Sequence, residues 1–354
     1  MSLDLHVDRA RWEAHLDGVV AAVPGLVPVL KGNGYGFGNQ VLLGQAGRLG
    51  AALVAVGTPA DLAGLDAASS GYLGAVLVMV PWRACDPPVP ADWSGRVVQT
   101  IGHARHVAGL AAVAQPGQGI VVELMTSMRR HGVPAADLPE LARALAAAPG
   151  LDLRGFAVHL PLPGYVDAET EVDDIVATLA DHAIAVSTLF VSHVTAIQVE
   201  SLARRHPGID FRPRVGTALW LGDRSAYRAT AAVLDVHPLA RGDRYGYRAR
   251  RALTRGQVVV VSGGTANGIS TEPPGHIGSV RKRVTTFASG GLEAAGLAMS
   301  PYAVSGSRRW FAEPPHMQVS MLILPARAAV PDVGDEVPVN VGMTLTRFDR
   351  IVWN

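Results

Sequence analysis

The chain has 354 residues, of which 49% are hydrophobic and 17% are charged, a composition that can fill one or two sizeable globular cores. Its 31 basic and 30 acidic side chains nearly cancel, so no net charge marks it for nucleic acid or an anionic membrane. The single cysteine, Cys85, cannot form an internal disulfide and has no metal-ligand cluster near it in sequence, which favours the cytoplasm. The expected partner is a small molecule, and no metal site is expected.

The N-terminal stretch MSLDLHVDRARWEAHL mixes charged and apolar residues and lacks the apolar core of a secretory signal, so we expect no signal peptide. Apolar runs such as AALVAVG and GAVLVMV are far shorter than the ~20 residues of a transmembrane helix. Their β-branched residues are typical of buried strands. We therefore expect no membrane partner.

From residue 26 onward, short apolar strands alternate with Ala- and Leu-rich amphipathic helices. The expected strands are LVPVLKG, ALVAVG, GAVLVMV, GRVVQTI, GIVVELM, LRGFAVHLP, TLFVSHV and IDFRPRVG, and the expected helices lie near 40–49, 59–65, 103–114, 135–147, 169–183 and 197–206. Seven or eight such units predict a parallel sheet covered by helices, and their number favours a closed (β/α)₈ barrel over an open sheet. We assign residues 1–228 to this α/β barrel.

The pattern changes after about residue 228. Strands such as GQVVVVSGG and HMQVSMLILP are separated by Gly, Pro and charged turns, without convincing helices between them. This pattern predicts an all-β domain over residues 229–354. No long linker or low-complexity tract separates the two predicted domains, so we expect them to pack closely.

A single lysine, Lys31, ends the first apolar strand of the barrel, in VPVLKGNGYGFG. Function in such barrels lies at the C-terminal ends of the strands. A lysine there can form a Schiff base with an aldehyde cofactor, and the glycines after it let a phosphate ester approach the backbone. Tyr35 can then donate its hydroxyl to that phosphate. Taken alone, the motif also fits a solvated lysine before a flexible turn.

Several segments in the same order make the chain resemble the alanine racemases, pyridoxal-phosphate (PLP) enzymes with an N-terminal barrel and a C-terminal β domain. VPVLKGNGYGFG resembles the family's cofactor-lysine motif, which implies Lys31 as Schiff-base lysine and one catalytic base, and Tyr35 as a phosphate ligand. ELMTSMRRHG resembles the segment whose arginine, here Arg130, binds the cofactor ring oxygen and orients the substrate carboxylate. Glu123 stands where many members have a carbamoylated lysine, so it would supply the same negative charge.

Further strand ends extend the resemblance. LRGFAVHLP resembles the strand that ends in a histidine against the cofactor ring, here His159. RPRVGTALWLG implies that Arg214 faces the pyridine nitrogen, while the N–H groups of Gly216 and Thr217 bind phosphate; Thr195 matches a phosphate-binding serine. A guanidinium keeps its proton, so Arg214 would make the pyridine a weaker electron sink than an aspartate would. This favours proton removal and return at Cα over transamination.

The β domain resembles the family with departures. ARGDRYGYR keeps the family tyrosine as Tyr247. The spacing of SGSRRWFAEPPHMQVSMLIL puts Met317 at the position of a methionine whose backbone N–H contacts substrate, and Gln318 replaces the following aspartate. The resemblance therefore implies the fold of this domain more strongly than its chemistry.

The second catalytic base of the family is a tyrosine delivered across a homodimer interface, and VVVVSGGTANGIS has Thr265 at that position. Thr346 replaces another tyrosine of the site. A threonine hydroxyl is far less acidic than a phenol, whose pKa is about 10, so Thr265 cannot simply take over as acid and base. Lys31 serves one face of Cα, and the other face is left open between Tyr247, His316 and a water held by Thr265.

The resemblance predicts a PLP-dependent isomerase, an amino-acid racemase that yields a D-amino acid from a small substrate. It also implies a head-to-tail homodimer in which the β domain of the partner completes the site. One alternative is another PLP reaction at Cα, such as a lyase, a decarboxylase or a specialised racemase, because loss of the tyrosine would enlarge the pocket. Related decarboxylases carry a Cys–Asp pair in the β domain, whereas Cys85 lies in the barrel. The other alternative is a catalytically degenerate PLP-binding protein.

Overall fold

A computed structural model describes residues 2–269 and 298–354 of the chain. The chain divides into two compact units, one of residues 14–222 and one that combines residues 1–13 with residues 223–354. The first residues thus group with the C-terminal unit, although the sequence assigned them to the barrel with the rest of 1–228. The reason is strand β1 (Leu3–Val7), which pairs with β10 (Tyr227–Leu239) and β18 (Arg350–Trp353).

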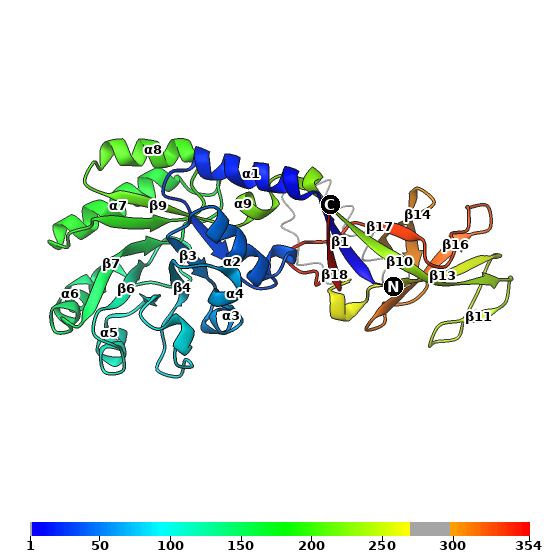
Figure 1. The fold of residues 1–354 in the computed structure, drawn as a ribbon, viewed down its shortest axis with the longest axis horizontal. Coiled ribbons are helices and arrows are strands. Elements are labelled where there is room, and N and C mark those ends of the chain that lie inside the picture. The colour runs from blue at the N-terminus through cyan, green and yellow to red at the C-terminus, as the bar shows by residue number, and fades with distance from the viewer. Residues whose placement is uncertain (1, 270–297) are drawn as a thin grey trace. The chain divides into compact units, whose positions relative to one another are not determined.

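The barrel unit contains eight parallel strands that close on themselves in chain order. They are β2 (Val27–Leu30), β3 (Leu53–Val56), β4 (Ala75–Pro81), β5 (Val97–Ile101), β6 (Gln118–Leu124), β7 (Leu151–Val158), β8 (Thr188–Val191) and β9 (Asp210–Val215). The ring is closed by β2 and β9, where Val27 pairs with Arg214. The helices lie around the outside of the strands (Figure 1). The predicted (β/α)₈ barrel is confirmed.

The α-helices of the described residues are α1 (Arg9–Ala22), α2 (Asn39–Arg48), α3 (Pro59–Ala63), α4 (Ala67–Ser70), α5 (Ala104–Ala111), α6 (Leu138–Ala146), α7 (Ala168–Asp181), α8 (Ala196–Arg205) and α9 (Thr217–Leu221). Capping boxes fix the starts of α3 and α8, with Thr58 and Thr195 as the capping residues. None of the helices in the described residues has both the length and the apolar character needed to cross a membrane.

Apolar side chains from seven consecutive strands, β2 to β8, fill the interior of the barrel: Val27, Val29, Ala55, Leu77, Val98, Val121, Ala157 and Phe190. A second buried cluster packs the outer faces of the strands against α5 to α8. Strands that are buried on both faces need continuous apolar runs, which explains why the barrel strands could be found in the sequence. Such a filled barrel holds the strand ends in fixed positions.

In the part of the second unit that the structure describes, one sheet has eight strands in the order β13, β16, β15, β14, β17, β10, β1, β18, with a further pairing of β13 and β10. Its remaining strands are β13 (Gly256–Ser262), β14 (Met299–Val304), β15 (Ser307–Phe311), β16 (Val319–Pro325) and β17 (Glu336–Val339), and β11 (Arg244–Tyr245) pairs separately with β12 (Arg250–Arg251). All pairs in the sheet are antiparallel except β1 with β18. The predicted C-terminal β architecture is confirmed; Ser270, at the end of VVVVSGGTANGIS, lies outside the described residues.

Candidate active site

The C-terminal ends of β6, β7, β8, β9 and β2 lie next to one another, because these strands are consecutive in the closed barrel. Four of them carry a predicted site residue at this end. Glu123 is the penultimate residue of β6, His159 directly follows β7, Arg214 lies near the end of β9, and Lys31 directly follows β2. The fold thus brings these predicted residues to the rim where barrels of this kind carry function.

Lys31 stands at this rim with its side chain accessible to solvent. Partial burial, and then the guanidinium groups of Arg130 and Arg214, lower the pKa of its amine, whereas Asp61 raises it. A lowered pKa increases the fraction of neutral amine, which is the form that attacks an aldehyde or accepts a proton. Gly57 allows this arrangement, because a Cβ there would lie 2.7 Å from Oδ2 of Asp61 and 3.1 Å from Cβ of Lys31.

Tyr35 is folded inward by the glycine-rich loop after Lys31. It has a left-handed backbone, with φ of 54°, and only 4% of its surface is exposed. Burial raises the pKa of its phenol, so the hydroxyl stays protonated and can donate a hydrogen bond. This hydroxyl lies against Gly216, the residue before α9, where a Cβ would overlap it. Two of the predicted phosphate ligands are therefore neighbours, and an uncommon backbone conformation holds one of them.

Arg214 is buried, with 7% of its surface exposed. Its Nη2 donates to the carbonyl oxygen of Val158 at 2.9 Å, but its buried Nε has no hydrogen-bond partner among the described residues. An unpaired buried donor costs about 1–3 kcal/mol. Burial lowers the pKa of the guanidinium, Glu123 raises it and Arg130 lowers it, yet an arginine remains protonated in proteins. The free N–H of this cation suits an acceptor such as a pyridine nitrogen.

Glu123 places a carboxyl group beneath the rim, with 2% of its surface exposed. Burial raises the pKa of its carboxyl group, and Arg214 and Arg130 act in the opposite direction. Arg130 lies in the exposed loop after β6, beside Arg129, which has a left-handed φ of 52°. Glu123 is thus an encoded carboxylate close to both guanidinium groups.

His159 is held in one orientation at the end of β7. Its Nδ1 lies 3.1 Å from Oγ of Ser192, and its carbonyl oxygen accepts a hydrogen bond from Oγ1 of Thr126 at 2.7 Å. Burial lowers the pKa of His159 to about 3, and four neighbours reinforce the shift: Arg130, Arg214, His193 and Lys31. The imidazole is therefore neutral at physiological pH, and its pKa depends on the other charged groups of the site.

The segment after β8 contains site residues that sequence reasoning missed. His193 has a left-handed φ of 57°, its Nδ1 donates to the carbonyl oxygen of Leu160 at 2.7 Å, and its ring lies 5.0 Å from that of His159. Ser192 holds His159, as described above. The polar pair Ser-His at a strand end was the available signal. Thr195, which the sequence assigned to phosphate, uses its hydroxyl to cap α8: it accepts from the N–H of Gln198 at 3.3 Å.

In the second unit, three predicted residues of the β domain lie close together: Thr265, His316 and Tyr247. The N–H of Thr265 donates to the carbonyl oxygen of His316 at 2.9 Å, and the ring of His316 lies 4.5 Å from that of Tyr247. Glu313, which the sequence analysis did not single out, accepts from Nε2 of His316 at 2.7 Å and from the N–H of Tyr247 at 2.8 Å. Met317 is 73% exposed beside them. Thr346, in contrast, is buried.

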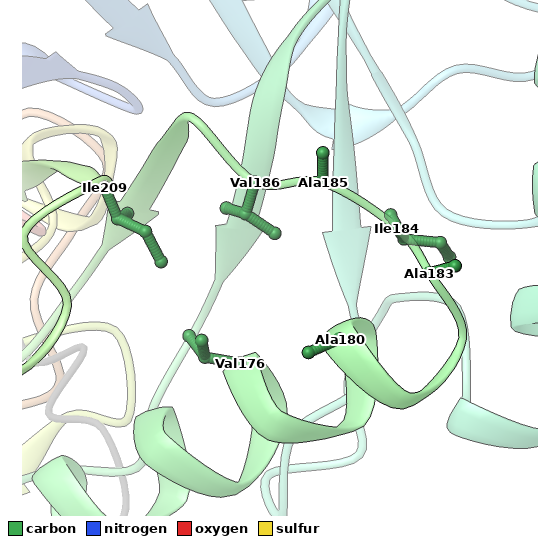
Figure 2. Close-up of a pocket in the computed structure, with 7 residues that line it drawn as sticks. All are labelled: Val176, Ala180, Ala183, Ile184, Ala185, Val186 and Ile209. Carbon is green, nitrogen blue, oxygen red and sulfur yellow. The ribbon is translucent and has the colours of Figure 1, made fainter.

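An apolar hollow on the barrel unit lies away from these residues. It is lined by Val176, Ala180, Ala183, Ile184, Ala185, Val186 and Ile209, between α7 and the segments that lead into β8 and β9 (Figure 2). The start of each strand faces the opposite end of the barrel from Lys31 and His159. The hollow has no charged lining residue, so we do not assign it to the candidate site.

Residues 7–203, more than half of the chain, match the family described as alanine racemase, N-terminal domain. The chain belongs to the alanine racemase family. No curated protein matches it. Solved alanine racemases share its fold. The alanine racemase of Bacillus anthracis with bound L-Ala-P matches with a TM-score of 0.70 at 19% identity, and the match covers 96% of this chain and 85% of that one. The alanine racemase from D-cycloserine-producing Streptomyces lavendulae has a TM-score of 0.71 at 16% identity, and the match covers 100% of this chain and 97% of that one.

The fold is shared with a racemase of a different substrate. The histidine racemase of Leuconostoc mesenteroides subsp. sake matches with a TM-score of 0.68 at 14% identity, and the match covers 100% of this chain and 97% of that one. At such identities the likeness concerns the fold. Membership of the alanine racemase family therefore leaves the substrate of this chain to be argued from its own site.

Proposed function

We propose that this protein is a PLP-dependent amino-acid racemase in which Lys31 holds the cofactor and serves one face of the substrate Cα. The observation that carries the proposal is the buried Nε–H of Arg214, which has no hydrogen-bond partner among the residues described. It belongs to a cluster that also contains Lys31 and His159. A pyridine nitrogen would satisfy this donor.

The other residues of the rim suit the same group. The hydroxyl of Tyr35 and the backbone of Gly216 adjoin, as ligands of one phosphate must. The N–H of Thr217 and the hydroxyl of Thr195 are the further proposed phosphate ligands, and the neutral ring of His159 suits the face of a pyridine. When bound, PLP supplies an electron sink that makes the Cα proton removable.

Different residues of the chain then have different roles in the transfer of that proton. The amine of Lys31, with its lowered pKa, removes the proton from one face of Cα and returns it. Arg214 donates a hydrogen bond without giving up its own proton, which limits electron withdrawal and favours return of the proton to Cα. Arg130, with the negative charge of Glu123 nearby, orients the substrate carboxylate.

The opposite face of Cα needs a second group, which we place in the β unit of the partner in a head-to-tail homodimer. Support comes from the cluster of Thr265, His316, Met317 and Tyr247 within that unit. His316, Tyr247 and a water on Thr265 are the candidates, and the N–H of Met317 is the proposed substrate contact. The short side chain of Thr265 also favours a second function, a PLP reaction that needs a base on one face of Cα alone.

Hydrogen exchange in D₂O tests the proposal. The purified protein, supplied with PLP, is incubated with single enantiomers of a panel of amino acids, and deuterium at Cα and optical purity are measured together. Exchange with loss of optical purity is expected from wild type and not from Lys31→Ala. Exchange with retained configuration would support the one-face reaction, and no exchange with any amino acid would contradict both.

A further inference from the structure

Basic side chains gather on the barrel rim beside Arg130. They follow the ends of three strands that are neighbours in the barrel, β4, β5 and β6: Arg83, His103, Arg105, His106 and His131. Each follows the C-terminal end of its strand, so the cluster lies on the same rim as Lys31. Neither the proton transfer at Cα nor the proposed cofactor contacts use these residues.

Arg83 is the centre of this basic cluster. Its Nη1 donates to the carbonyl oxygens of Pro81 and Trp82, both at 2.9 Å, and lies 3.4 Å from Nδ1 of His106. Its Nε and Nη2 have no hydrogen bond among the described residues. These are the two donors with which a guanidinium binds a carboxylate or a phosphate in a bidentate way. The exposed Arg83 is thus held in place through Nη1, and its Nε and Nη2 donors are available to an anion.

The described carboxylates leave this charge unpaired. None of the ion pairs in the described ranges involves Arg83, His106 or His131. Asp86 accepts a hydrogen bond from the backbone N–H of Arg83 at 2.7 Å, and this is a contact to the main chain. Positive groups that lack counter-ions at the rim of a site attract an anion.

His106 and His131, two of the three histidines of the cluster, are partly buried and respond to this charge. The ring of His106 lies 5.7 Å from that of His103 and 6.4 Å from that of Trp82. Burial lowers the pKa of His106, and Arg83, Arg105 and His103 lower it further. Burial, Arg130 and Arg83 likewise lower the pKa of His131. A bound anion would reverse the electrostatic part of these shifts, so its binding should be coupled to proton uptake.

Arg130 connects this cluster with the candidate active site. The same guanidinium lowers the pKa of His131 on one side and those of Lys31 and His159 on the other. Arg130 also directly precedes His131 in the loop after β6, so a second anionic group of a substrate whose α-carboxylate is bound by Arg130 would lie near the basic cluster.

We propose that Arg83, His106 and His131 bind a negatively charged side-chain group of the substrate, which is then an amino acid with a second carboxylate or a phosphate. This inference rests on the proposed function and adds the substrate class to it. A guanidinium binds a carboxylate and a phosphate through the same pair of N–H donors, so the experiment below tests substrates that carry each group.

The test compares substrates in matched pairs: aspartate with asparagine, glutamate with glutamine, and O-phosphoserine with serine. For each, kcat/KM of Cα exchange in D₂O is measured with the PLP-loaded protein. We expect the charged member of at least one pair to be favoured by about tenfold or more, and Arg83→Gln to lower that ratio by about tenfold or more. Arg143→Gln is the control, because the exposed side chain of Arg143 on α6 bonds only the carbonyl oxygen of Pro139 within the described residues, and it should leave the ratio unchanged.

A second readout does not depend on turnover. Calorimetric titration with aspartate and with O-phosphoserine, in two buffers of different ionisation enthalpy, should show proton uptake that Arg83→Gln reduces. Exchange that favours the neutral members, or equal ratios in Arg83→Gln and Arg143→Gln, would overturn the inference and leave the proposed function standing. Loss of exchange with every substrate, with anion binding retained in the titration, would overturn the proposed function instead.

Discussion

The hydroxyl of Tyr35 lies directly against the backbone of Gly216, and a Cβ at position 216 would overlap it. Gly216→Ala must therefore displace the tyrosine from the proposed phosphate site. We expect PLP affinity to fall by about tenfold or more, because a hydrogen bond to a charged group is lost. Fluorescence titration with PLP measures the change.

Gly208→Ala is the matched control for this substitution, because a Cβ there meets no atom within 4 Å. It should bind PLP as tightly as wild type. Equal affinity of the two variants would contradict the assignment of Tyr35 and Gly216 to the phosphate.

The barrel strands could be predicted because each is a short, β-branched run that is buried on both faces. Their ends then located Lys31, His159 and Arg214. Strand β1 was harder, since its partners β10 and β18 follow more than 200 residues later and nothing local encodes that pairing. Glu313 was missed for the same reason: its link to Tyr247 joins residues 66 positions apart.

The neutral state of His159 gives the protein a distinct response to acid. Its pKa of about 3 lies below the ordinary 6.5, so the folded protein binds fewer protons than the unfolded chain between these values. Its contribution to the free energy of unfolding is therefore lost as the pH falls from 6.5 towards 3. His159→Asn removes this term, so acidification should destabilise the variant less than wild type.

Urea unfolding of both proteins at about pH 7 and about pH 4.5 measures this difference. All other titrating groups are common to the two proteins, so their effects cancel in the comparison. A stability difference that is the same at both pH values would show that His159 is not held neutral.

Thr195 has a structural role that is separable from its proposed contact with phosphate. Because its hydroxyl caps α8, Thr195→Ala should lower the free energy of unfolding by about 1 kcal/mol. Thr195→Ser keeps the hydroxyl and should retain most of the stability. If the alanine variant loses stability but binds PLP as wild type does, Thr195 is a capping residue alone and its assignment to phosphate fails.

His316 is the candidate second-face group with the arrangement of a general acid and base, because buried Glu313 holds its Nε2 at 2.7 Å. We expect His316→Gln to slow racemisation by about 100-fold or more, while exchange on the Lys31 face continues. Deuterium content and optical purity, measured on the same samples, separate these effects. The opposite pattern, with racemisation intact in His316→Gln and lost in Tyr247→Phe, would assign the role to Tyr247.

The most direct test of the central claim is to find where PLP attaches. The protein is incubated with PLP, reduced with borohydride and digested, and the peptides are mapped by mass spectrometry. The proposed function predicts a phosphopyridoxyl group on the peptide that contains Lys31, and its loss in Lys31→Ala. Labelling of another lysine-containing or N-terminal peptide instead, undiminished labelling of Lys31→Ala, or no label at all would contradict it.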